Sequence, residues 1–451
     1  MKKIAIWGFG ITGQATLRYF LKSPKYNEYQ IDVYDSQSAD SFGTILIDSE
    51  RVNYYFDTKD IAEVSNYEIL LVSPSISKNH PVIQEAYTAG VKVCNDTMIF
   101  IEEFKDIGKI VGVTGSNGKS TVASLIHDSL KILDKKTILV GNIGLSPLDY
   151  LIDTPEDELK DIIAVLELSS FQLEIFDINH FVDIAIITNI SPNHLDRHND
   201  DIQEYADVKM KIFNQNNSHI VTVYDDPGIQ NYILPKINSN LLELVSLDQL
   251  VNNQLLDFIN KNFVETKQIK LPGKHNLYNV AIALKALDIL GIEINNEKLI
   301  NFIQNYKGLE HRIEFVRNFK GLDFYNDSKS TSPDATRVAI KSFGNDQKIT
   351  LIMGGKDKNV SFEYLGPIIK NKVEKLIILS HEIDEKLIKL AEDNQVEYEV
   401  VINLQQAIDA AILNKNYAGL ILFSPGSSSL GKFKNYEDRG EQFKDIVNRL
   451  K

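Results

Sequence analysis

The segment from Gly112 to Thr121 constrains the fold most, because an apolar stretch leads there through a glycine loop into Lys-Ser-Thr. The apolar residues predict a buried strand, and the next segment predicts a helix with one packed face formed by Val122, Leu125, Ile126 and Leu130. A strand, a glycine loop and a helix in this order favour phosphate binding, since backbone N–H groups and the positive helix end point at the anion. We therefore expect an α/β chain that handles a nucleoside triphosphate.

The loop is shorter than the usual phosphate-binding pattern, since Val113 rather than glycine stands five positions before Gly118. Lys119 would supply a charge for the β- and γ-phosphate oxygens, and the Ser120 hydroxyl would ligate Mg²⁺. A chance glycine turn before a helix is the alternative. The residues expected at the nucleotide are Gly115, Ser116, Asn117, Gly118, Lys119, Ser120 and Thr121.

Strand-like runs alternate with amphipathic segments along the chain, as in proteins with mainly parallel sheets. The runs span residues 3–7, 31–34, 69–72, 110–113, 137–140, 162–166, 184–187, 349–353, 376–379 and 420–423. A length of 451 residues suggests three domains at roughly 150 residues each. Charged residues 102–106 and the segment 305–308 suggest the boundaries, so we predict domains at 1–107, 108–309 and 310–451.

A net charge of −14 without a basic stripe argues against a nucleic-acid partner. Cys94 is the only cysteine, which excludes an intramolecular disulfide and a thiolate metal cluster and fits a reducing compartment. Residues 1–7 resemble a first strand rather than a signal peptide, and no apolar run approaches the roughly 18 to 20 residues of a membrane helix. We expect a soluble cytoplasmic protein that does not bind membranes.

A second glycine loop follows the first strand, because Gly8, Gly10 and Gly13 form Gly-x-Gly-x-x-Gly and the next strand ends at Asp35. This pattern is typical of dinucleotide folds, with a diphosphate at the helix N-terminus and the carboxylate near a nucleoside. The glycines could instead serve only close packing of strand and helix. Because the chain already has an ATP loop, a nucleotide-tagged substrate is favoured here over a nicotinamide.

In the central region, Glu167 ends a strand that could neighbour the phosphate-loop strand, where an acid typically helps to hold Mg²⁺. His194 and His198 follow the next strand, but most such histidines are structural. Lys209 and Lys211 by themselves resemble a solvated helix face.

Taken together, these segments resemble the Mur ligases, the ATP-dependent amide-forming enzymes of peptidoglycan precursor synthesis, over the whole chain. Residues 167–174 are most like those of the D-glutamate-adding member. Further matching segments are 141–144, 189–198, 273–279, 310–312, 326–329, 354–358, 424–425 and 434–436. The resemblance implies a three-domain architecture: a Rossmann-like N-terminal domain for the UDP substrate, a central P-loop ATPase-like domain, and a C-terminal Rossmann-like α/β domain for the amino acid.

The resemblance also implies roles for individual residues. Lys209 falls where the family carries a CO₂-modified lysine, whose carbamate oxygens suit Mg²⁺. The catalytic residues implied are Lys119, Glu167, His194, Lys209 and Lys329, and the metal site would use Ser120, Glu167, His194 and Lys209. Further nucleotide contacts would come from Asn276, Asn279, Arg312 and Asp327. Substrate contacts would come from Ile11, Thr12, Asp35, Ser36, Asn142, Ser169, Gln172, His194, Lys329, Thr331, Lys358, Ser429, Leu430 and Tyr436.

The implied activity joins D-glutamate to UDP-N-acetylmuramoyl-L-alanine through an acyl phosphate, releasing ADP and phosphate, with ATP, Mg²⁺ and a Lys209 carbamate as cofactors. We expect the enzyme to act as a monomer. The sequence departs from the family at Asn193, where an aspartate is usual. Three alternatives stay open: a sister ligase that adds another amino acid or extends folate with glutamate, a nicotinamide oxidoreductase, and a nucleotide-gated binding protein without chemistry.

Overall fold

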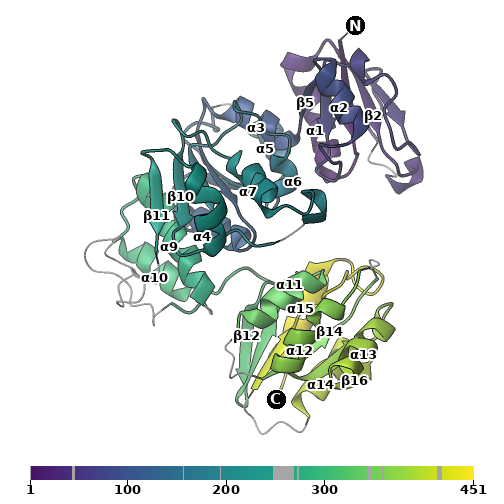
Figure 1. Cartoon of the computed structure of the whole chain (residues 1–451), viewed down its shortest axis with the longest axis vertical. Coiled ribbons are helices and arrows are strands. Elements are labelled where there is room, and N and C mark those ends of the chain that lie inside the picture. Colours follow the sequence, from purple (N-terminus) through teal and green to yellow (C-terminus); the bar gives the residue numbers. More distant parts are fainter. Residues whose placement is uncertain are drawn as a thin grey trace. The chain divides into compact units, whose positions relative to one another are not determined.

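The computed structural model describes residues 2–42, 46–155, 157–192, 195–246, 269–271, 274–343, 348–357, 360–413 and 419–451. Three β-sheets follow one another along the chain, each with helices on its faces (Figure 1). Contacts divide the described residues into two compact units, of which the first contains the first two sheets and the second contains the third.

The first sheet is parallel and has the order β3-β2-β1-β4-β5. Its strands are β1 (Lys2–Trp7), β2 (Tyr29–Tyr34), β3 (Val52–Tyr55), β4 (Ile69–Val72) and β5 (Lys92–Cys94). Its helices are α1 (Ile11–Lys22) and α2 (Pro81–Thr88), and α3 (Asp96–Phe104) follows β5. Because β1 lies at the centre and α1 follows it, the first glycine loop opens at the carboxyl edge of the sheet, where ligands bind in such folds.

The second sheet is parallel as well and has the order β11-β10-β9-β6-β8-β7. Its strands are β6 (Lys109–Thr114), β7 (Thr137–Gly141), β8 (Ile163–Glu167), β9 (Ile184–Ile187), β10 (His219–Val223) and β11 (Leu242–Val245). The helices of this region are α4 (Lys119–Ile132), α5 (Pro147–Asp153), α6 (Ser170–Leu173), α7 (Ile202–Met210), α9 (Lys274–Ile289) and α10 (Glu297–Asn305). The central strand β6 therefore has the phosphate loop at its tip.

The third sheet has the order β12-β13-β17-β14-β15-β16, and only the β12–β13 pair is antiparallel. Its strands are β12 (Glu314–Phe319), β13 (Leu322–Asn326), β14 (Ile349–Met353), β15 (Val373–Leu379), β16 (Glu397–Val401) and β17 (Gly419–Phe423). Its helices are α11 (Pro333–Lys341), α12 (Gly366–Lys372), α13 (Asp384–Asp393), α14 (Leu404–Ile412) and α15 (Tyr436–Asn448). Separate apolar clusters cover its two faces.

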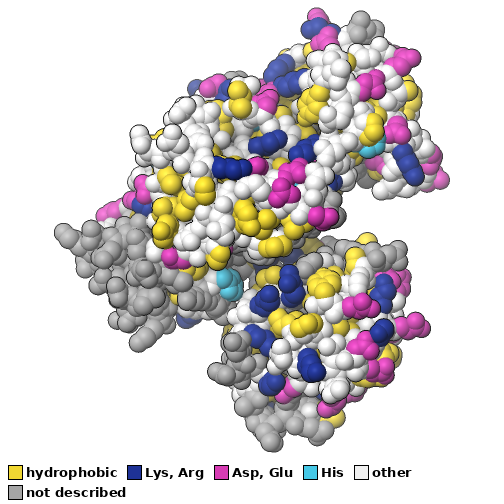
Figure 2. Space-filling view, viewed as in Figure 1, with side chains coloured by type: hydrophobic (Ala, Val, Ile, Leu, Met, Phe, Trp, Pro, Cys, Tyr) yellow, Lys and Arg dark blue, Asp and Glu magenta, His cyan; other side chains and the backbone are white. Residues whose placement is uncertain are grey.

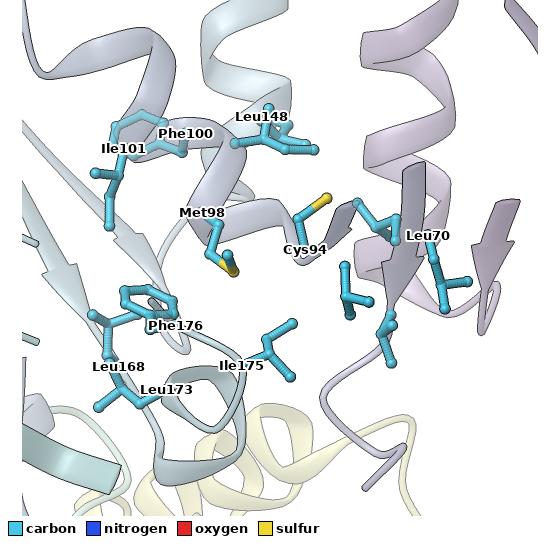
Figure 3. Close-up of a cluster of buried hydrophobic side chains, with 14 of the residues drawn as sticks. Leu70, Cys94, Met98, Phe100, Ile101, Leu148, Leu168, Leu173, Ile175 and Phe176 are labelled. Carbon is cyan, nitrogen blue, oxygen red and sulfur yellow. The ribbon is translucent and has the colours of Figure 1, made fainter. Parts of the chain in front are cut away.

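Helix α3 joins the first two sheets through one continuous apolar core. Met98 and Phe100 are buried there together with Leu168 and Phe176 of the central region (Figure 3). The charged residues that suggested a boundary at 102–106 thus include the end of this helix, and Phe104 between them is fully buried. Residues 107 and 108 are partly buried between exposed neighbours, and a Cβ on Gly108 would lie 2.3 Å from the Ile162 carbonyl oxygen, so the chain packs closely at this position. The predicted boundaries remain predictions.

Acidic and basic side chains both occur in small scattered groups on the face shown in Figure 2. Among the helices that the structure describes, none is long and apolar enough to cross a membrane.

Candidate active site

The phosphate loop bends sharply between β6 and α4. Gly115 and Gly118 have φ angles of 139° and 84°, which glycine adopts without strain. A Cβ on Gly115 would lie 2.0 Å from the Thr188 hydroxyl, and one on Gly118 would lie 2.5 Å from the Asn279 side-chain oxygen. The loop thus packs against the segment after β9 and against α9, where its backbone shape is fixed.

Hydrogen bonds hold the same loop in place. The backbone N–H groups of Ser116 and Asn117 donate to the carbonyl and side-chain oxygens of Asn189, at 2.9 and 3.0 Å. The Lys119 ammonium donates to the carbonyl oxygens of Gly115 and Ser116 at 2.9 and 3.0 Å, so it lies over the loop. Ser120 and Thr121 are buried in the first turn of α4. The arrangement agrees with what a phosphate site needs, namely a rigid glycine turn with a cation above it.

Glu167 lies at the tip of β8, directly beside Val113 of β6 in the sheet register. Its side chain is buried, and Oε1 accepts a hydrogen bond of 2.8 Å from the Asn142 amide. The other oxygen, Oε2, is buried and has no hydrogen-bond partner among the described residues. Burial of a carboxylate oxygen without a hydrogen bond costs folding free energy unless a cation or a hydrogen-bond donor binds the oxygen. Mg²⁺, which prefers oxygen ligands, fits this position.

Lys209 on α7 is 1% exposed, although its sequence context suggested a solvated helix face. Its ammonium lies 4.5 Å above the Tyr205 ring and donates to the Thr114 hydroxyl at 3.3 Å. Burial, reinforced by the charge of Lys119 and opposed by that of Glu167, lowers the pKa of Lys209 well below its usual value. The amine therefore loses its proton readily, as a lysine that reacts with CO₂ must.

A cavity of about 520 Å³ lies between the first glycine loop and the central region, both within the first compact unit. It brings together predicted residues from distant parts of the chain. They are Ile11, Thr12, Lys119, Asn142, Ser169, Gln172 and Lys209. The same cavity is also lined by Pro74 and Phe171, which the sequence did not single out. A pocket of this size accommodates a nucleotide-linked small molecule.

Asp35 occupies a different position, since it is not among the residues that line this cavity. Its carboxylate accepts hydrogen bonds from the backbone N–H groups of Phe9, at 2.6 Å, and Gln37, at 2.8 Å. It therefore braces the glycine loop from the tip of β2. Ser36, the next residue, is exposed and also lies outside the lining. Contacts of Asp35 and Ser36 with a nucleoside remain predictions.

The glycines of the first loop have distinct roles. A Cβ on Gly13 would lie 2.1 Å from the carbonyl oxygen of Gly8, and one on Gly8 would lie 2.5 Å from the Ser73 Cβ, so these two glycines permit close packing. A Cβ on Gly10, the N-cap of α1, would have no atom within 4 Å. Close packing therefore explains why glycine occurs at positions 8 and 13. It does not explain glycine at position 10, where the space beside the N-terminus of α1 is open.

Ser169 and Gln172 have a structural function in addition to lining the cavity. The Ser169 hydroxyl accepts from the Gln172 backbone N–H, while the Gln172 side-chain oxygen accepts from the Ser169 backbone N–H at 2.9 Å. This capping box starts α6. The Gln172 carbonyl in turn accepts from the Asn95 amide at 2.8 Å, a contact that sequence reasoning missed.

Two of the predicted site residues, His194 and Lys358, lie outside the described residues, as does Asn193. His198 is described and is fully buried, and burial lowers its pKa to about 4. Its ring meets the Tyr205 ring edge-on, with 5.3 Å between centroids, and neither ring nitrogen has a hydrogen-bond partner in the described part of the chain. It is thus buried without the hydrogen bond that a structural histidine usually makes.

The second compact unit places further predicted residues at the carboxyl edge of its sheet. Asp327 follows β13, and its Oδ2 accepts from the Ser424 hydroxyl at the tip of β17 at 2.6 Å. Burial raises the pKa of Asp327 to about 6. Arg312 is only partly buried, and its charge acts against that rise. Both remain nucleotide contacts by prediction.

Lys329 and Tyr436 lie together, with the ammonium 5.7 Å from the ring centroid. Burial raises the pKa of Tyr436 to about 12. Of the other predicted amino-acid contacts, Ser429 is buried, Thr331 is partly buried and Leu430 is exposed. A cation, hydroxyls and an aromatic ring around one sheet edge suit a small dicarboxylate.

Arg439, which the sequence did not suggest, is buried behind these residues. Its guanidinium donates to the Ser328 hydroxyl at 3.0 Å, the Ser328 carbonyl at 2.7 Å and the Ser427 carbonyl at 3.1 Å. Burial lowers its pKa to about 10. It ties together the two loops that carry Lys329 and Ser429. No local pattern on α15 identified it, because its partners are mostly backbone carbonyls.

Three domain families match the chain in order. The N-terminal domain of MurD-like Mur ligases matches residues 2–95, the Mur ligase middle domain matches residues 113–287, and the Mur ligase glutamate ligase domain matches residues 311–426.

Curated relatives align over the entire chain. UDP-N-acetylmuramoylalanine--D-glutamate ligase from Clostridium botulinum (strain Kyoto / Type A2) is 30% identical, and the match covers 100% of this chain and 97% of that protein. The protein of the same name from Buchnera aphidicola is also 30% identical, with 100% and 98% covered.

Solved structures share the fold. UDP-N-acetylmuramate-alanine ligase MurC from Thermotoga maritima superposes with a TM-score of 0.52 at 15% identity, covering 99% of each chain. MurF ligase from Thermotoga maritima in complex with ADP gives 0.53 at 18% identity, covering 85% of this chain and 90% of that one. At these identities the likeness concerns the three-domain α/β fold, which it confirms.

Proposed function

The chain belongs to the Mur ligase family, and from that premise we propose that it is an ATP-dependent ligase that joins D-glutamate to UDP-N-acetylmuramoyl-L-alanine in peptidoglycan precursor synthesis. The observation that carries the proposal is the 520 Å³ cavity, in which the glycine loop of the first domain faces Lys119 and Lys209 of the central domain. A nucleotide-tagged carboxylate held there would lie beside the ATP phosphates.

The first step overcomes the low electrophilicity of a carboxylate. An oxygen of the L-alanyl carboxylate attacks the γ-phosphorus of ATP, the bond to the β-γ bridging oxygen breaks, and ADP leaves. Lys119 and the positive N-terminus of α4 would stabilise the charge on the transferred phosphoryl group, largely by position and electrostatics. The product is an acyl phosphate, whose phosphate is a good leaving group.

The second step forms the amide. The unprotonated amine of D-glutamate attacks the acyl carbon, the bond to phosphate breaks, and the amine proton is released. The residues that would bind the amino acid are Lys329, Thr331, Lys358, Ser429, Leu430 and Tyr436. The two carboxylates of glutamate suit lysine partners, and the buried Arg439 keeps the two binding loops in register.

Mg²⁺ fits the donor set of the central domain. Glu167 offers a buried oxygen without a partner among the described residues, Ser120 offers a hydroxyl in the same loop region, and a carbamate on Lys209 would add oxygens. His194 would complete the set. When bound, the metal ions supply positive charge that neutralises the phosphate oxygens. A carbamate requires a neutral lysine amine, and the burial of Lys209 supports that state.

Phosphate release from ATP tests the proposal directly. We would supply UDP-N-acetylmuramoyl-L-alanine and add D-glutamate, L-glutamate, glycine or nothing in parallel. Release that depends on D-glutamate alone is the expected result. Release with another amino acid would indicate a sister ligase, and no release under any condition would indicate a binding protein. A change in NADH fluorescence on titration would favour the nicotinamide alternative.

A further inference from the structure

Arg197 lies at the end of the short 3-10 helix that follows β9, and its guanidinium reaches across to the first domain. It donates hydrogen bonds to the backbone carbonyls of Pro74 at 3.1 Å, Ser75 at 3.0 Å and Ile76 at 2.7 Å, all in the loop after β4. One guanidinium thus binds the carbonyl oxygens of three consecutive residues. Because the N–H groups of a guanidinium lie in one rigid plane, these hydrogen bonds constrain the path of the loop.

The same guanidinium forms a buried ion pair. Its Nε donates to Glu174 Oε1 at 2.9 Å and its Nη2 to Oε2 at 3.0 Å, and the glutamate side chain is 1% exposed. Glu174 follows α6, and its backbone carbonyl accepts from the Lys211 ammonium at 2.6 Å. Removal of one partner would leave a buried charge without compensation, which is costly.

Arg197 also stacks on a wall of the substrate cavity. Its guanidinium carbon lies 4.8 Å from the centroid of the Phe171 ring. Phe171 and Pro74 both line the cavity, whereas Arg197 itself does not. The arginine therefore supports two lining residues, one from each domain, from behind.

From this geometry we propose that Arg197 is a positioning residue for the UDP-linked substrate, which sets the distance between the Pro74 loop and Phe171 and so the width of the cavity. The inference rests on the proposed function. It predicts an effect on binding of the UDP-linked substrate but not of ATP, since the phosphate loop is held by a separate set of hydrogen bonds to Asn189.

The test compares Arg197→Met and Arg197→Lys with Arg18→Met. Arg18 also bridges the first and central domains through a bidentate pair with Asp149, at 2.8 and 2.7 Å, but among the described residues its side-chain hydrogen bonds do not reach the lining of the cavity. We would measure KM for UDP-N-acetylmuramoyl-L-alanine and for ATP, kcat, the Kd of the UDP-linked substrate by calorimetry, and the thermal transition of each variant.

We expect Arg197→Met to raise both KM and Kd for the UDP-linked substrate about tenfold or more, with KM for ATP changed less than about twofold. Arg197→Lys should give an intermediate value and stay folded, because lysine keeps the charge beside Glu174 but cannot bond three carbonyls. Arg18→Met should leave all constants near wild type.

The proposal is overturned if both Arg197 variants keep the wild-type Kd for the UDP-linked substrate, or if both KM values rise together in proportion to a lower thermal transition. Failure of the proposed function is distinguishable, because it would appear as absent D-glutamate-dependent phosphate release in the wild-type enzyme before any variant is made.

Discussion

At the scale of single residues, burial changes the chemistry of Lys209 most. A lysine on an exposed helix face is a cation, whereas this one is 1% exposed and is held beside Lys119 with a strongly lowered pKa. The neutral amine is the form that can attack CO₂, and the carbamate that we propose would replace the amine with an oxygen donor.

We predict that Lys209→Ala loses most of the ligase activity and that high bicarbonate does not restore it, because no amine remains to be modified. A ¹³C NMR spectrum of wild-type enzyme with labelled bicarbonate should show a carbamate signal that the variant lacks. If the activity of Lys209→Ala were indistinguishable from that of the wild type, Lys209 would have no role as a carbamate.

Glu167 gives a second prediction at this scale. Glu167→Gln keeps the side-chain shape and the hydrogen bond from Asn142 but removes the negative charge. In the described part of the chain, the other oxygen of this buried carboxylate has no hydrogen-bond partner. Without metal, we expect the variant to be as stable as wild type or more so, since an uncompensated buried charge is relieved. Thermal unfolding with and without Mg²⁺ would check this.

In the same experiment, Mg²⁺ should raise the unfolding temperature of the wild type and have little effect on the variant. Equal stabilisation of both proteins by the metal would contradict a role for Glu167 at the metal site. Activity should fall strongly in the variant.

At the scale of elements, the first glycine loop contains one glycine needed for packing, Gly13, and one predicted to serve ligand binding, Gly10. Gly13→Ala places a Cβ 2.1 Å from the Gly8 carbonyl and should destabilise the protein by roughly 1 to 3 kcal/mol. Gly10→Ala, at the N-cap of α1 with a φ of −65° and open space around the new Cβ, should leave stability unchanged.

If a diphosphate binds at this helix end, Gly10→Ala should instead weaken binding of the UDP-linked substrate, measured by calorimetry, since the methyl group would occupy the space of the ligand. Wild-type affinity in this variant would contradict a diphosphate site at Gly10.

At the scale of the whole molecule, His180 links α3 to the loop after α6. Its Nε2 lies 2.8 Å from Glu102 and its Nδ1 2.7 Å from Asp177, and Lys92 also binds Glu102. Burial opposes the imidazolium charge, but the two carboxylates outweigh it and raise the pKa of His180. Burial likewise opposes ionisation of Glu102, but its hydrogen bonds from His180 and Lys92 lower its pKa to about 2.

This linkage predicts a pH effect on stability. A histidine whose pKa is raised by folding stabilises the protein fully below the unfolded value of about 6.5, and this contribution is lost as pH rises through the folded value. Glu102 and Asp177, with lowered pKa values, stay ionised in that range. The unfolding free energy should therefore fall from pH 6 to 9 more steeply in wild type than in His180→Gln. Parallel curves would contradict this.

The fold was largely predictable because its signals are local. Strands 69–72, 184–187 and 349–353 were predicted with the bounds that the structure shows, and strand 110–113 lacked one residue at each end. Strands such as β3, β5 and β16 were not predicted. All three lie at sheet edges. The side chains of β3 and most of those of β16 are exposed or partly buried, and β5 has only three residues, so no apolar run marks them.

The candidate site was predictable in part. The glycine loops and the acid at a strand tip follow from local pattern, and parallel topology then brings β6, β8 and β9 to one edge. Lys209 came only from the resemblance, since its helix looked solvated. The nucleoside contact of Asp35 stays a prediction, and the hydrogen bond that its carboxylate accepts from the Phe9 backbone, 26 residues away, was not foreseen.

The sequence by itself therefore determined the α/β class, the two glycine loops, the helix start that carries Lys119 and the strand tip that carries Glu167, because each depends on neighbours along the chain. Only the tertiary structure decided that Lys209 is buried, that Arg197 supports the substrate cavity and that Arg439 joins two loops. Arg197 bonds backbone carbonyls more than 100 residues away in sequence, and Arg439 bonds one carbonyl at such a separation and another 12 residues away. A carbonyl is the same in every residue. A backbone carbonyl that accepts such a hydrogen bond therefore cannot be identified from a sequence pattern, because only the tertiary packing brings it next to the arginine.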